Sequence, residues 1–184
     1  MSENKVKKSR VRSTAYPYYG LERCVELATA LRDNAGLHSA PVKIAIGYLG
    51  FTEKSSRGDR AISALTQFGL LDQEGQKSQR TVKLSVLAQN IILSRLQSGG
   101  KGDLSLVQQA ALKPKIIHHI WEKYGKQNGL PTNEILQFQL EQDDAVTINK
   151  DSFSRVMKIV RDTLAYAEIN AGSSSDNDNG SSTL

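Results

Sequence analysis

The spacing of apolar residues is the feature of this sequence that most limits the folds open to the chain. Between residues 20 and 34, apolar side chains recur at intervals of three and four, which is the stripe of an amphipathic helix. The same spacing marks residues 57–68, and Gly36 and Gly69 follow the two stripes as helix stops. The sequence therefore predicts a mainly helical core. Its first members are Leu21, Cys24, Val25, Ala28 and Leu31, followed by Ala61, Ala64, Leu65 and Phe68.

A second spacing, the alternation of polar and apolar residues, marks a short hairpin after these helices. In residues 80–84, Val82 and Leu84 face one way, which is the period of a half-buried strand. A partner strand begins at residues 70–71, and a polar loop over residues 73–79 joins the two. This pattern predicts a small β-wing.

The region between the two helical stripes is broken into short pieces. Residues 41–42 are predicted to be extended, and a short helix over residues 43–49 ends at Gly50. A polar turn follows, and either Ser55 or Ser56 can cap the helix after it, since a serine oxygen accepts a hydrogen bond from a free backbone N–H. The sequence thus predicts two helices joined by a turn.

The order helix, short strand, helix, turn, helix, hairpin and helix over residues 17–97 resembles the winged helix-turn-helix superfamily. Three strings carry the resemblance: TEKSS in the turn, AISALTQFGLLDQ from residue 61, and QRTVKLSVLAQNIIL from residue 79. The resemblance implies that a helix at about residues 56–68 lies in the DNA major groove and that the hairpin contacts phosphate. Uncharacterised prokaryotic proteins with a winged helix followed by a small helical part are similar in layout, and that similarity implies no activity.

The second half of the chain has helical spacing without a hairpin. Pro114 can start a second helical piece, and Thr132 and Asn149 can cap later helices. We predict a three- or four-helix unit. The expected organisation is a disordered basic arm (1–15), a winged helix domain (16–98), a Gly-rich hinge (99–104), a helical unit (105–170) and a disordered polar tail (171–184).

Charge is distributed unevenly along the chain. The formal net charge is +5, and the excess of Lys and Arg lies in residues 1–100, whereas the remainder is slightly acidic. Basic surface attracts a polyanion because phosphate contacts release counterions. We therefore predict a non-enzymatic DNA-binding protein, a small transcriptional regulator. The predicted DNA-binding residues are Lys54, Ser55, Ser56, Arg57, Arg60, Ser63 and Gln67 in the turn and helix, Lys77, Ser78 and Arg80 in the hairpin, and Lys7, Lys8, Arg10 and Arg12 in the arm.

The exposed face of the helix at residues 56–68 supports two interpretations. Arg60 has the geometry to bond guanine and Gln67 to bond adenine, and the hydroxyls suit phosphates or bases. Asp59 on the same face repels phosphate, and such a mixed face is also typical of ordinary solvated surface. A winged-helix adaptor that binds protein and no nucleic acid is the alternative.

No residue pattern in the sequence supports catalysis. The single cysteine, Cys24, excludes an internal disulfide, and we interpret it as a small buried apolar residue. His118 and His119 are adjacent, so their side chains diverge on a helix, and no third metal ligand follows Glu122 at a usual spacing. Residues 99–102 lack the strand and spacing of a phosphate-binding loop. We predict no enzyme activity, cofactor or metal, and no small-molecule ligand is evident from the sequence.

Location and partners follow from the same sequence. No stretch has the roughly 20 apolar residues of a membrane helix, and no apolar run follows the basic N-terminus as in a secretory signal. We predict a cytoplasmic protein with double-stranded DNA as its partner. A homodimer through the C-terminal unit is a second expectation. Trp121 and Tyr124 share an apolar stripe there, which core packing explains first and a dimer interface second.

Overall fold

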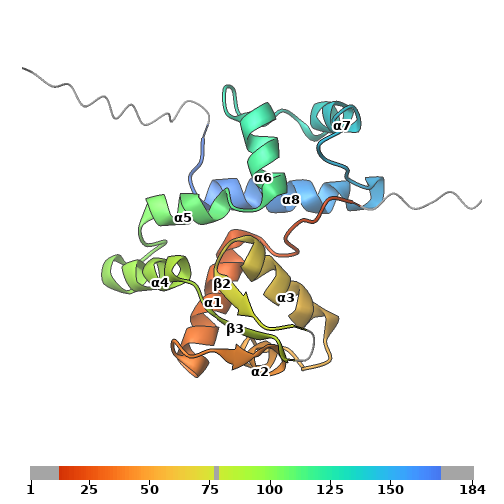
Figure 1. The fold of residues 1–184 in the computed structure, drawn as a ribbon. Helices are drawn as coiled ribbons and strands as arrows, with labels where there is room; N and C mark the ends of the chain where they lie inside the picture. The colour runs from red at the N-terminus through yellow and green to blue at the C-terminus, as the bar shows by residue number, and fades with distance from the viewer. Residues whose placement is uncertain (1–12, 77–78, 171–184) are drawn as a thin grey trace, which may run out of the picture.

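The described part of the protein is mainly helical with a small antiparallel sheet, as the apolar spacing predicts (Figure 1). The structure, a computed structural model, describes residues 13–76 and 79–170. The predicted tail and nearly all of the predicted arm lie outside this range. In chain order the elements are α1 (Leu21–Ala35), β1 (Ala40–Pro41), α2 (Val42–Tyr48), α3 (Ser56–Gln67), β2 (Leu71–Glu74), β3 (Thr81–Leu84), α4 (Val86–Ser98), α5 (Leu104–Ala111), α6 (Lys115–Ile120), a π-helical turn (Trp121–Gly125), α7 (Asn133–Glu141) and α8 (Lys150–Tyr166).

The sheet is built around the predicted hairpin. Its strand order is β1-β3-β2, with antiparallel neighbours, so β3 lies in the middle. Val82 and Leu84 point into the core, which confirms the predicted alternation. The predicted start of the loop is wrong, because Gln73 and Glu74 pair with β3 and lengthen β2, Glu74 lying opposite Thr81.

The predicted stripes of α1 and α3 are buried. All nine side chains named for them are at most 2% exposed. Ile62, which the prediction omitted, is also buried on α3. Gly36 ends α1 with a φ of +61°, a left-handed conformation that glycine adopts without steric cost. The short helix α2 begins at Val42 rather than residue 43, since β1 covers only residues 40–41.

Two serines fix the starts of α3 and α4. Ser55, not Ser56, caps α3, because its Oγ accepts the Arg57 backbone N–H at 3.2 Å. Ser85 caps α4 and also donates from its hydroxyl to the Gly69 carbonyl at 2.6 Å. This second bond ties the start of α4 to the turn that ends α3.

The predicted side-chain caps of α7 and α8 are wrong, although both helices begin where the sequence predicts. Neither Thr132 nor Asn149 accepts a hydrogen bond from its helix through its side chain. The Thr132 hydroxyl instead bonds the Glu134 carboxyl, and a backbone hydrogen bond together with this hydroxyl lowers the pKa of Glu134.

The helix that begins after Pro114 changes its pitch, a feature that the spacing of apolar residues does not predict. α6 ends at Ile120, and the π-turn follows, with the Lys126 N–H donating to the Trp121 carbonyl at 2.9 Å. The Trp121 ring lies so close to Gly125 that a Cβ at Gly125 would meet it at 2.5 Å. Trp121 is only 7% exposed, which confirms its interpretation as a core residue.

The two predicted halves share one hydrophobic core. Their buried side chains join in a single cluster that runs from α1 through α8. The Leu21 N–H donates to the Thr163 hydroxyl at 3.4 Å, and Gln108 donates to the Ala167 carbonyl at 3.2 Å. The glycines between α4 and α5 form a turn with positive φ values, but the parts on either side pack together. Within the described residues, no helix is both long enough and apolar enough to cross a membrane.

Candidate nucleic-acid interface

Helix α3 separates a buried face from an exposed polar face. Its apolar stripe packs on α1 and α2, while the opposite face is open to solvent. Of the residues predicted to bind DNA, Ser56, Arg57, Arg60 and Ser63 are exposed, and Gln67 is half-buried. Lys54 is exposed in the turn before the helix, and the capping residue Ser55 is half-buried.

Several polar groups on this face already bond one another. The Gln67 amide donates to the Ser63 hydroxyl at 3.2 Å. The Thr66 hydroxyl donates to the Ile62 carbonyl at 2.8 Å and accepts from the Gln73 amide of β2 at 2.6 Å. An adenine contact by Gln67 would therefore exchange an existing hydrogen bond for a new one.

Arg60 belongs to a cluster that sequence reasoning missed. Its guanidinium lies over the Tyr18 ring, 4.5 Å from the ring centroid, and the guanidinium of Arg155 from α8 lies 5.3 Å from the same centroid. Neither arginine has a carboxylate partner among the described residues, and both are exposed. The three residues are far apart in the chain, so no local spacing links them. Aromatic stacking leaves the edge of a guanidinium free to donate hydrogen bonds.

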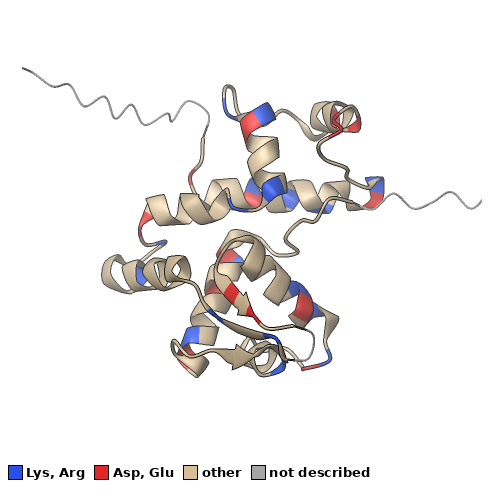
Figure 2. Ribbon diagram, viewed as in Figure 1, with Lys and Arg blue, Asp and Glu red and all other residues tan. Residues whose placement is uncertain are grey.

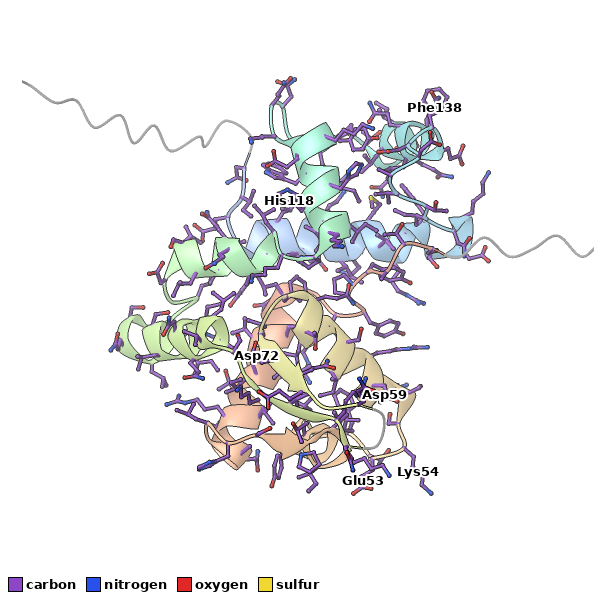
Figure 3. The ribbon with its side chains drawn as sticks, viewed as in Figure 1. Glu53, Lys54, Asp59, Asp72, His118 and Phe138 are labelled. Atoms are coloured by element: carbon purple, nitrogen blue, oxygen red, sulfur yellow. The ribbon has the colours of Figure 1, made fainter. Side chains whose placement is uncertain are left out.

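Acidic residues lie among the basic ones on this side of the molecule. Figure 2 shows Lys or Arg and Asp or Glu next to each other at the N-terminal end of α3. Glu53 and Lys54 lie in the turn before α3, Asp59 lies in its first turn, and Asp72 lies on β2 (Figure 3). The surface is consequently mixed in charge rather than uniformly basic.

The hairpin and the arm are described only in part. Arg80 is exposed and directly precedes the first residue of β3, whereas Lys77 and Ser78 lie outside the described residues. Lys83 bonds Glu74 at 3.0 Å, and this hydrogen bond raises the pKa of Lys83. Lys83 therefore contributes no unpaired charge. The predicted arm residues Lys7, Lys8, Arg10 and Arg12 also lie outside the described range.

No group of three or more His, Cys, Asp or Glu side chains in the described residues is arranged to hold a metal ion. Comparison with protein-family models, curated proteins and solved structures gives no match.

Proposed function

We propose that residues 16–98 are a winged helix domain and that the protein is a non-enzymatic, cytoplasmic DNA-binding regulator. The observation that supports this most is helix α3, which buries one face completely and presents Arg57, Arg60 and Ser63 on the other. It follows a short helix and a turn and precedes the hairpin, an order that suits insertion of α3 into the major groove.

Phosphate contacts would come from the basic residues around α3. Lys54 and Arg57 lie on either side of the start of the helix. The guanidinium groups of Arg60 and Arg155 both lie over the Tyr18 ring. A strand of phosphates would supply the negative charge that these arginines lack within the described protein. In the proposal, the hairpin residues Lys77, Ser78 and Arg80 and the arm residues Lys7, Lys8, Arg10 and Arg12 add further phosphate contacts.

Fluorescence anisotropy of a labelled random DNA duplex tests the proposal. We expect binding at low salt that weakens steeply as salt rises, because phosphate contacts release counterions. Arg60→Ala should cost roughly 1–3 kcal/mol of binding free energy, confined to one base position if Arg60 reads guanine and equal on all sequences if it contacts phosphate. Arg23→Ala is the matched control, since Arg23 is an exposed arginine on α1 already paired with Glu26. Absence of binding at low salt would refute the proposal.

The Tyr18 ring allows a sharper test of the paired arginines. Tyr18→Leu removes the ring on which Arg60 and Arg155 lie, and Tyr18→Phe keeps it. We expect the leucine variant to weaken DNA binding and the phenylalanine variant to bind like the wild type. Arg155→Ala should lower the slope of log affinity against log salt by about 1. Lys158→Ala, on the same helix but paired with Asp162, should leave it unchanged.

A protein-binding adaptor is the second candidate, favoured by Asp59, which lies in the first turn of α3 among its basic residues. A second copy of the chain remains the proposed protein partner. Trp121 is buried, and the large apolar side chains exposed in the described C-terminal unit are instead Ile135 and Phe138 on α7. Figure 3 shows Phe138 on this helix. A protein contact that is largely apolar would not weaken steeply with salt, which separates the two candidates.

A further inference from the structure

A cavity of about 580 Å³ lies in the C-terminal unit, away from the α3 face. Its walls come from α6, from the π-turn and from the loop between α7 and α8, and Thr14 from the segment before α1 also lines it. Four of its five titratable lining side chains are basic, namely Lys115, His118, His119 and Lys123, and Glu122 is the fifth. Apolar wall is supplied by Ile116, Ala145 and Val146.

A buried carboxylate holds the two walls of this cavity together. The Asp143 side chain is 3% exposed and accepts hydrogen bonds from His119 Nε2 at 2.7 Å and from the Tyr124 hydroxyl at 2.6 Å. Lys123 Nζ lies 3.0 Å from the same carboxylate, and the Ala145 N–H donates to it at 3.0 Å. Burial raises the pKa of Asp143, but these hydrogen bonds outweigh burial and hold the pKa well below its usual range. His119 and Lys123 are thereby fixed at the cavity edge.

The π-turn brings these groups together. Lys123 and Tyr124 both belong to it, and the change of pitch after Ile120 directs them toward Asp143. Single π-helical turns are rare and occur frequently at functional sites, where they aim side chains that an α-helix would direct elsewhere. The turn therefore marks this cavity independently of its charge.

Lys115 is an unpaired cation on the cavity lining, and the His118 ring beside it is an unpaired polar group. Lys115 and His118 are exposed and make no hydrogen bond or ion pair within the described residues. Figure 3 shows His118 on α6. The acidic lining residue, Glu122, is paired with Lys126 at 2.9 Å, and that hydrogen bond lowers the pKa of Glu122. An anion entering the cavity would meet free donors at one side and apolar wall at the other.

We propose that this cavity binds a small organic anion. Its carboxylate or phosphate group would lie on Lys115 and His118, and its apolar body would lie against Ile116, Ala145 and Val146. Asp143 is a positioning residue, because it holds His119 and Lys123 without facing the ligand itself. This inference goes beyond the proposed function and does not depend on DNA binding.

Histidine ring signals in the NMR spectrum of the full chain provide the test. The chain has three histidines, and His38 is exposed in the turn after α1, so it serves as an internal control. Titration with inorganic phosphate and, separately, with butyrate should shift the signals of His118 and His119 saturably and leave His38 unchanged. The phosphate arm reports a phosphate ligand, and the butyrate arm reports a carboxylate with an apolar body.

Variants of the lining residues complete the experiment. Lys115→Gln and His118→Gln should each weaken probe binding roughly three- to tenfold, the usual effect of losing one hydrogen bond of ordinary net strength. Lys43→Gln, an exposed lysine on α2 outside the cavity, should bind as the wild type does. Unshifted His118 and His119 signals with both probes, or equal and unsaturable shifts of all three histidines, would overturn the proposal.

Discussion

At the scale of single residues, the buried Asp143 carboxylate is contacted by His119, Lys123, Tyr124 and the Ala145 N–H. The sequence predicts that the adjacent side chains of His118 and His119 diverge on their helix. In the structure His118 is exposed and His119 bonds Asp143, but both line the same cavity. The sequence did not predict this partner, because residues 119 and 143 lie on separate elements. A carboxylate this deeply buried is stable in its charged form only while its donors remain in place.

Replacement of Asp143 should show a defined pH dependence. Asp143→Asn should lower the free energy of unfolding by roughly 3 kcal/mol at neutral pH, because it breaks a buried charge network. The folded state lowers the Asp143 pKa, so its contribution is present above the unfolded value of 3.8 and is lost as pH falls through the folded pKa. Urea unfolding at several pH values should therefore show the difference between wild type and variant shrinking below pH 3.8.

The neighbouring acid supplies the control for that measurement. Asp144 is exposed, and Asp144→Asn should change stability by no more than about 0.5 kcal/mol. A difference between wild type and Asp143→Asn that stays constant from neutral to acid pH would contradict the role assigned to the carboxylate.

At the scale of elements, the packing of α2 on α3 depends on a glycine. Gly58 is buried in the first turns of α3, and a Cβ at this position would overlap the Ile46 side chain of α2. Helix propensity alone favours alanine over glycine, so local and tertiary effects oppose each other here. The close approach sets how α3 lies against α2 and hence how its exposed face is presented.

Two glycine substitutions separate these effects. Gly58→Ala should destabilise the protein by roughly 1–3 kcal/mol, because the added methyl overpacks the contact with Ile46. Gly47→Ala on α2 meets no atom within 4 Å and should stabilise by up to about 1 kcal/mol. Thermal unfolding measures both, and a Gly58→Ala protein as stable as the wild type would show that Ile46 moves aside at no cost.

At the scale of the whole molecule, the two predicted parts have a common core. Helices α1 and α8 pack directly, and Gly20 at the start of α1 lies beside Thr163 of α8. The predicted hinge joins α4 to α5 without separating two cores. Because small domains with one core unfold cooperatively, we expect a single transition.

Each half of the chain contains one residue whose signal reports on unfolding. Trp121 is the single tryptophan and reports on the C-terminal unit, and Cys24 is the single cysteine, buried in α1. Burial raises the pKa of the Cys24 thiol, so it should react with a thiol reagent only after unfolding. In urea, Trp121 fluorescence and Cys24 reactivity should change at the same midpoint. Exposure of Cys24 at clearly lower urea would show that the halves unfold separately.

The sequence by itself determined the elements that depend on local periodicity and on local hydrogen bonds. The buried stripes of α1 and α3, the alternation of β3 and the stop at Gly36 all follow from residues close together in the chain. Where two local solutions were equivalent, as for Ser55 and Ser56, the sequence left the choice open. Nearly all of the α3 face could be predicted in the same way, since helical spacing alone separates its two sides.

Only the tertiary structure decided the contacts between residues distant in the chain. The guanidinium groups of Arg60 and Arg155 lie over the Tyr18 ring because α8 packs beside the N-terminal helices. Asp143 bonds His119 because the α7–α8 loop folds back onto α6. The close approach of Gly58 to Ile46 is also set by tertiary packing, because the two residues lie on different helices, α3 and α2. Periodicity states which face of an element is buried, but the partner of that face is chosen by the packing of the whole core.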